Sequence, residues 1–186
     1  MPEVIFENNV TINANQDVFI VTDRLIFDSN VNFTGTGQII FYVRQNLTSN
    51  NIFSLPSANN SVVGRSDRPH LFLIYVDQTM PAMTVTASNN SRIFGSFMFN
   101  NANLDFSNNV AFGGYLMTGG TTVSLSNNAD VFTALYYAPN ANVTIQEKGI
   151  VRGAIIANKV TMGNNAIIQY EPAFLTNFPF VVESPI

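Results

Sequence analysis

The sequence predicts an all-β protein in which the whole chain, residues 1–186, forms a single-domain parallel β-helix (solenoid) with coils of about 19–20 residues. Three observations favour this fold: a repeat of that length, short strands of alternating apolar and polar residues inside each repeat, and asparagine pairs that recur at nearly fixed separation. No segment of the repeat has the apolar spacing of an amphipathic helix.

The repeat is clearest in the second half of the chain. Successive units start with apolar–polar–apolar residues at Val85, Leu104, Val123 and Val143, which are 19, 19 and 20 residues apart, and a shorter unit starts 17 residues later at Val160. Ten residues after the first four starts stand Gly95, Gly114, Thr133 and Gly153. Twelve residues after them stand Phe97, Leu116, Leu135 and Ile155. Two independent columns therefore keep one period.

Asparagine occurs 26 times, and its pairs follow the repeat: Asn89–Asn90, Asn108–Asn109, Asn127–Asn128 and Asn164–Asn165. In a solenoid, equivalent residues of neighbouring coils lie about 4.8 Å apart, so stacked amides can hydrogen-bond along the axis. Asparagine also tolerates the left-handed backbone conformation that a tight corner requires. The pairs therefore predict asparagine ladders at one corner of the solenoid.

The first half of the chain follows the pattern less regularly. Units start at Val10 and Leu25, and the second of them has Gly35 ten residues after its start. Residues 48–69 are rich in the turn formers Asn and Ser and carry two prolines, which predicts a loop insertion there. Residues 169–186 leave the repeat and are apolar and proline-containing, so we expect a capping tail that covers the C-terminal coil.

Composition excludes several classes of function. Charged residues make up 11% of the chain and form no basic stripe, which argues against nucleic-acid binding. The chain has no cysteine, so disulfides, thiolate zinc sites and a thiol nucleophile are excluded. No apolar run is long enough to cross a membrane, and the first residues lack the pattern of an export signal. We therefore expect no membrane insertion by this segment.

Three segments near the C-terminus resemble the signature of an uncharacterised bacterial and archaeal family of β-solenoid domains associated with type IV pilus (PilX-like) proteins. They are YAPNA at 137–141, GAIIA at 153–157 and YEPAFL at 170–175. The sequence departs from the family at Gln146–Lys148, where a small-residue turn is usual, and at Glu171, where Asp is usual. The family has no catalytic motif. The resemblance implies an exported surface or pilus-associated structural module with an adhesive role.

The residues give little support for catalysis or for a bound metal. His70 is the sole histidine and stands in a predicted loop, which makes a poor metal site and a poor catalytic triad. Many β-helices are polysaccharide lyases or hydrolases that place acidic residues on one outer face. Here the outward column of Thr86, Asp105, Ser124, Thr144 and Thr161 holds one acid, and Asp130 stands in another column. We therefore predict no catalytic, cofactor-binding or metal-binding residues.

The repeat raises the question of two kinds of binding surface, an ice-binding face and an aromatic patch. The mixture of Thr, Ser and Asp in the outward column disfavours a regular ice-binding face. Phe99, Tyr136 and Tyr137 make a candidate aromatic patch for sugars or proteins, although Phe99 and Tyr137 are also placed to stack on each other in the core or on its rim.

We expect a non-enzymatic structural or adhesive module, located outside the cell or in the cell envelope, with other protein subunits or surface glycans as partners. The alternatives are a carbohydrate-active β-helix enzyme that uses Asp105 or Asp130, and a bactofilin-like self-assembling polymer with bare apolar ends. No cofactor is expected.

Overall fold

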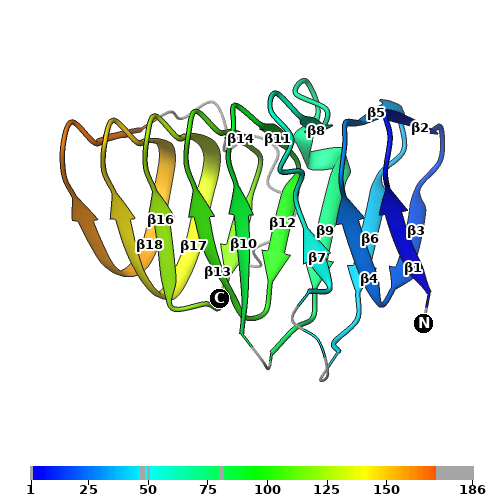
Figure 1. Ribbon diagram of the computed structural model, residues 1–186, viewed down its shortest axis with the longest axis horizontal. Helices are drawn as coiled ribbons and strands as arrows, with labels where there is room; N and C mark the ends of the chain where they lie inside the picture. Colours follow the sequence, from blue (N-terminus) through cyan, green and yellow to red (C-terminus); the bar gives the residue numbers. More distant parts are fainter. Residues whose placement is uncertain (1, 47–48, 50, 80–81, 171–186) are drawn as a thin grey trace, which may run out of the picture.

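The computed structural model describes residues 2–46, 49, 51–79 and 82–170. Throughout this part of the chain the backbone forms strands, turns and bends, apart from one short 3-10 helix at Pro69–Leu71. The strands lie side by side along one long axis, as Figure 1 shows. The predicted all-β parallel solenoid is confirmed, with about eight turns.

Each coil contributes short strands to three faces. The first face contains β1 (Glu3–Phe6), β4 (Arg24–Phe27), β7 (Phe53–Ser54), β10 (Met83–Ala87), β13 (Ala102–Phe106) and β16 (Thr122–Leu125). The second face contains β2 (Val10–Ala14), β5 (Val31–Gly35), β8 (Val62–Gly64), β11 (Arg92–Phe94), β14 (Ala111–Gly113) and β19 (Ile167–Gln169). The third face contains β3 (Val18–Thr22), β6 (Ile39–Val43), β9 (Phe72–Val76), β12 (Ser96–Phe99) and β15 (Leu116–Thr118). Two long strands, β17 (Asp130–Ile145) and β18 (Ile150–Met162), pass through all three faces.

Neighbouring coils pair in parallel and keep the predicted period. On the first face Val85 lies beside Leu104, Leu104 beside Val123, Val123 beside Val143, and Val143 beside Val160. Because paired strands are about 4.8 Å apart, like residues form columns along the axis. Successive side chains of a strand point to opposite sides, so inward columns form the core and outward columns form the surface.

The first coil starts earlier than the sequence pattern indicated. Val10 belongs to β2 on the second face and pairs with Val31, whereas Leu25 lies on the first face between Val4 and Phe53. The residue that matches the later unit starts is therefore Val4. Strands on different faces share the same alternation of apolar and polar residues, so the pattern alone did not distinguish them.

The predicted loop insertion at 48–69 contains two strands of the solenoid. β7 pairs with β4, and β8 pairs with both β5 and β11, so this stretch supplies the first and second faces of an irregular third coil. The turn-forming residues lie at its corners, and β7 is only two residues long. Paired residues here are 28–30 positions apart instead of 19–20, as between Leu25 and Phe53, so the predicted insertion of extra loop residues is present. The prediction missed the two strands within it, because such short strands leave almost no alternation to detect.

One predicted column shifts by a residue. Leu116 pairs with Tyr136, and Tyr136 with Ile155, so Tyr136 replaces Leu135 in the inward column. A bulge between Phe132 and Leu135 causes the shift. Tyr136 is fully buried, whereas Leu135 is half-buried.

The core between the three faces is rich in phenylalanine. Five fully buried rings follow one another through four coils: Phe27, Phe41, Phe72, Phe97 and Phe112. Their edge-to-face contacts have centroid separations of 5.4–6.5 Å. Such contacts add to the free energy of burial, and the rings span the interior where the three sheets meet.

The asparagine pairs form the corner between the first and second faces, as predicted. All eight of these residues have positive φ, between 37° and 63°. The Asn109 amide donates to the Asn90 side-chain carbonyl at 2.9 Å and accepts a hydrogen bond from Asn128 at 3.0 Å. In the next coil Glu147 and Lys148 adopt the same left-handed conformation, with φ of 52° and 65°. The corner ladders are therefore confirmed, with one break at Lys148.

Glycine serves close approach between coils, as expected for its column. Gly114 has φ of +134°, and a Cβ placed on it would lie 2.0 Å from the carbonyl oxygen of Gly95 in the preceding coil. Of the predicted capping tail, residues 169–186, the last sixteen (171–186) lie outside the described residues.

Candidate functional site

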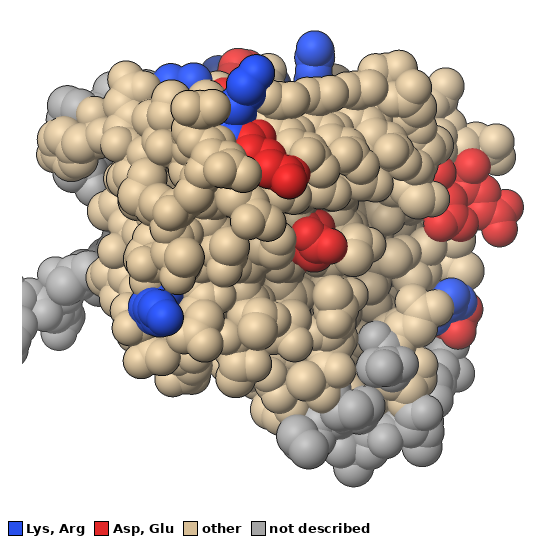
Figure 2. All heavy atoms as spheres, turned by 60° about the vertical axis from the view of Figure 1, so that its left-hand side comes forward, with Lys and Arg blue, Asp and Glu red and all other residues tan. Residues whose placement is uncertain are grey.

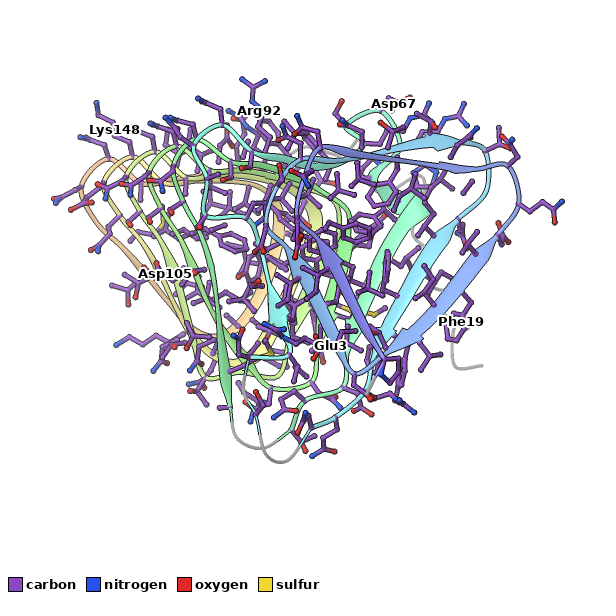
Figure 3. All side chains as sticks on the ribbon, turned by 45° about the vertical axis from the view of Figure 1, so that its right-hand side comes forward. Glu3, Phe19, Asp67, Arg92, Asp105 and Lys148 are labelled. Carbon is purple, nitrogen blue, oxygen red and sulfur yellow. The ribbon has the colours of Figure 1, made fainter. Side chains whose placement is uncertain are left out.

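The two candidate carboxylates do not meet. Asp105 lies on the first face and points to solvent, whereas Asp130 lies on the second face. Figure 3 shows Asp105 directed away from the solenoid. Asp130 is held by Arg152 of the next coil, with oxygen–nitrogen distances of 3.1 and 3.2 Å. The pair that a glycan-cleaving mechanism requires is therefore not assembled by these two residues.

Arg152 joins several coils on the second face. Besides Asp130 it donates to Gln169 at 3.0 Å, and its guanidinium carbon lies 4.8 Å from the centre of the Phe132 ring. Asp130, Arg152 and Gln169 belong to three successive coils. This arrangement is a structural clamp, because the charge of Asp130 is already neutralised by its neighbour.

His70 lies in the 3-10 turn that leads into β9 and is half-buried. Among the described residues, no group of three His, Cys, Asp or Glu side chains is close enough to hold a metal ion. In the same part of the chain, no helix is long and apolar enough to cross a membrane.

The outward surface of the first face is polar. The predicted column of Thr86, Asp105, Ser124, Thr144 and Thr161 is in register, as expected. A second outward column contains Thr84, Asn103, Thr122, Asn142 and Lys159. Charged groups are sparse on the visible surface in Figure 2. The two outward columns of the first face consist of hydroxyl and amide side chains apart from Asp105 and Lys159.

The first face is interrupted between β7 and β10. No ladder joins these two strands, so β1, β4 and β7 form a separate three-stranded sheet. A cavity of about 360 Å³ lies at the break. It is lined by Asn51, Phe53, Ser54, Leu55, Ala82, Thr84, Val85 and Thr86. Because β10 bonds to β13 through Met83 and Ala87, the alternating peptide groups of Thr84 and Thr86 point toward β7 across the break.

The third face carries an outward column of large apolar side chains. It passes in register through seven coils and is called the apolar column here: Val21, Tyr42, Tyr75, Met98, Met117, Tyr137 and Ile156. Beside its first three members lies a shorter outward row of Phe19, Ile40 and Leu73. Figure 3 shows Phe19 on the side of the molecule opposite Asp105, pointing outward.

Exposure is highest toward the two ends of this face. Phe19 is 64% exposed, Tyr137 40% and Ile156 47%, whereas the tyrosines and methionines between them are half-buried by their neighbours. The third-face strand residues include no Asp, Glu, Lys or Arg. Continuous apolar surface of this kind is uncommon on monomers and marks interaction sites.

Two tyrosines of the apolar column are held rigidly. The rings of Tyr42 and Tyr75 stack with centroids 5.3 Å apart and planes 17° from parallel. The Tyr42 hydroxyl donates to Asp77 at 2.6 Å, and Asp77 also accepts from the Asn100 amide. The hydrogen bond to Asp77, followed by burial, raises the pKa of Tyr42. Burial raises the pKa of Tyr75. Both tyrosines thus remain neutral at physiological pH.

The aromatic patch predicted from the sequence is present in part. Tyr137 points outward in the apolar column, but Tyr136 and Phe99 are buried. Phe99 pairs with Thr118, while Tyr137 pairs with Met117, so the expected stacking of Phe99 on Tyr137 does not occur. Sequence reasoning missed the rest of the column. The available signal was the unbroken apolar runs IIFYV at 39–43 and FLIYV at 72–76, which are apolar on both sides of the strand.

Comparison with known proteins adds one result. A family model described as a domain of unknown function (DUF7305) matches residues 114–177, about a third of the chain. This region contains the three segments whose resemblance was noted from the sequence. No curated protein matches the chain. No solved structure matches it either.

Proposed function

We propose that this chain is a non-enzymatic structural and adhesive module, exported to the cell surface or envelope and associated with a pilus. The observation that carries the adhesive part is the apolar column, which presents seven aligned side chains on a face without charged strand residues. A rigid solenoid holds such a column flat, so it offers a contact surface without prior ordering of the chain.

The site geometry supports a non-catalytic role. Asp105 and Asp130 are on different faces, and Asp130 is bound to Arg152. The asparagine ladders and the phenylalanine core serve the architecture of the coil itself. The side chains that are free to contact other molecules are therefore those of the outward columns. Contact with other subunits or with glycans is the simplest role for them. The association with a pilus rests on the resemblance of the C-terminal segments.

Location is tested in the native host. Intact cells are treated with an added protease, and the protein is followed by an antibody in whole cells and in fractions. The proposal predicts loss of the protein from intact cells while a cytosolic marker survives. Recovery of protected protein in the cytosolic fraction would contradict export.

Adhesion is tested with the purified full-length chain on apolar, hydroxylated and glycan-coated sensor surfaces. Tyr137→Ser removes an exposed ring from the third face, and Thr144→Ser is a mild control on the first face. We expect the first variant to lower adsorption and the control to leave it unchanged. Equal adsorption of both variants would show that the third face is not the contact surface.

A second candidate, the self-assembling polymer, is favoured by the last described coil. Inward residues there remain exposed, with Val160 at 41%, Met162 at 48% and Ile168 at 41%. End-to-end stacking of coils would bury them. Electron microscopy of the purified chain tests this candidate, which requires filaments whose axis follows the solenoid axis.

A further inference from the structure

We infer that the third face binds a second copy of this chain, face to face, with the two solenoid axes antiparallel. This inference rests on the proposed use of the third face as a contact surface and names its partner.

The first reason is the axial period. The apolar column repeats once per coil, at about 4.8 Å, and does so through seven coils. A partner must present side chains at the same spacing to stay in contact along the whole column. A second copy of this solenoid has that spacing, whereas an ordinary globular surface does not.

The second reason is charge. The chain has a formal net charge of −4, so two copies repel each other on average. The third-face strands have no charged residues. The carboxylate beside the apolar column, Asp77, already accepts hydrogen bonds from Tyr42 and Asn100, so close approach there buries no unpaired ion. The first and second faces carry Asp105, Asp130 and Arg92 instead.

The third reason is complementarity within the column. An antiparallel pair sets Val21 against Ile156 of the other copy and places Met98, the fourth of seven members, beside its own equivalent. The same arrangement brings Tyr75 against Met117, and sulfur–aromatic contacts of this kind are favourable. A two-fold axis closes the pair, so it does not grow into a chain.

The area sets the strength of the pair. The column is roughly 29 Å long at about 4.8 Å per coil, and a five-residue strand is roughly 16 Å wide. The footprint is therefore roughly 450 Å² per copy, or roughly 900 Å² in total, which is below the range of stable interfaces and typical of weak, transient ones. Such a pair is reversible and depends on protein concentration.

The test begins with sedimentation equilibrium of the full chain from micromolar to millimolar concentration. The wild type is expected to form dimers as concentration rises. Replacing both Met98 and Met117 by Glu should weaken self-association at least about tenfold, because two charges per copy enter the contact. The matched control replaces Thr86 and Ser124 by Glu on the first face and should associate like the wild type. Circular dichroism verifies folding, and Tyr137→Ser serves as a milder third-face variant.

Orientation is tested by cross-linking, which is clean because the chain has no native cysteine. Val21→Cys and Ile156→Cys chains, mixed and oxidised, should form a mixed disulfide, while either alone should not. Self-linked Val21→Cys dimers would overturn the antiparallel arrangement. A wild type that stays monomeric at every concentration would overturn the pairing. A monomeric protein that is exposed on cells and adsorbs through the third face would overturn the pairing and leave the proposed function intact. A dimer found in the cytosol would overturn the proposed function and leave the pairing intact.

Discussion

The asparagine ladder can be measured through two adjacent residues, because Asn108 and Asn109 share a backbone conformation but differ in side-chain bonding. Their φ values are 55° and 61°. The Asn109 amide bonds to Asn90 and to Asn128, while the Asn108 side chain makes no hydrogen bond among the described residues. Replacing each by Ala therefore removes the ladder bonds in one case and leaves them in the other.

The expected magnitudes follow from two contributions. An alanine forced into the left-handed region costs about 1–2 kcal/mol of folding free energy at either position. Asn109→Ala also loses two amide hydrogen bonds, each worth about 0.5–1.5 kcal/mol, and exposure keeps both near the lower end of that range. The Asn109 variant should thus be less stable than the Asn108 variant by about 1–2 kcal/mol.

Urea unfolding followed by circular dichroism measures both variants against the wild type, with the slopes compared to verify that the transition stays two-state. For a domain of this size the difference corresponds to a melting temperature lower by about 2–4 °C per kcal/mol. Equal losses for Asn108→Ala and Asn109→Ala would mean that the stacked amides contribute nothing and that the corner selects asparagine for its backbone conformation alone.

Three further outcomes are expected. Lys148→Asn should raise the free energy of unfolding by about 1–2 kcal/mol in the same urea assay. It restores a side-chain amide at the break in the ladder and removes the backbone strain of a lysine with positive φ. A loss of stability would contradict the ladder model. Tyr136→Phe should stabilise the fold by about 1 kcal/mol, because the buried Tyr136 hydroxyl has no hydrogen-bond partner among the described residues. Burial also raises the pKa of Tyr136 well above its usual value, so above about pH 10 the hydroxyl keeps its proton in the folded state and ionises in the unfolded state. The stability of the wild type should therefore fall as the pH rises past about 10. Thermal melts at several pH values should show a smaller decline for the Phe variant. In hydrogen exchange, the backbone amides of Thr84 and Thr86 should exchange faster than those of Asn103 and Asp105. The latter two occupy the same columns one coil later and are bonded to β10. Equal protection of all four amides would show that the break between β7 and β10 is closed in solution.

The sequence predicted the repeat because corner and core positions accept few residue types. Two successive left-handed residues favour asparagine, and the stacking of coils repeats that choice every 19–20 residues. The inward column from Val85 to Val143 could be read in the same way, since each coil there buries an apolar side chain.

The remaining errors have two physical causes, of which the first is that apolar neighbours hide which residues of a strand point inward. Leu135 and Tyr136 are both apolar, so the alternation could not reveal the bulge that puts Tyr136 inside. The third-face strands are apolar on both sides, and an outward tyrosine or methionine there looks like core. Short strands such as β7 carried too few residues to be recognised.

The division between inward and outward columns also determines how the surface can be tested. Inward residues such as Phe97 contact several coils, and changing them disturbs the whole stack. Outward residues such as Met98 project from strands whose hydrogen bonds do not depend on the side chain. Charge placed on the third face should therefore alter binding while the solenoid stays folded, and the same charge on the first face should alter neither. A third-face variant that unfolds would show that the apolar column stabilises the coil as well as the contact. Tyr137→Ser is the change best suited to separate these two roles, because the Tyr137 ring is the most exposed of the column's three tyrosines.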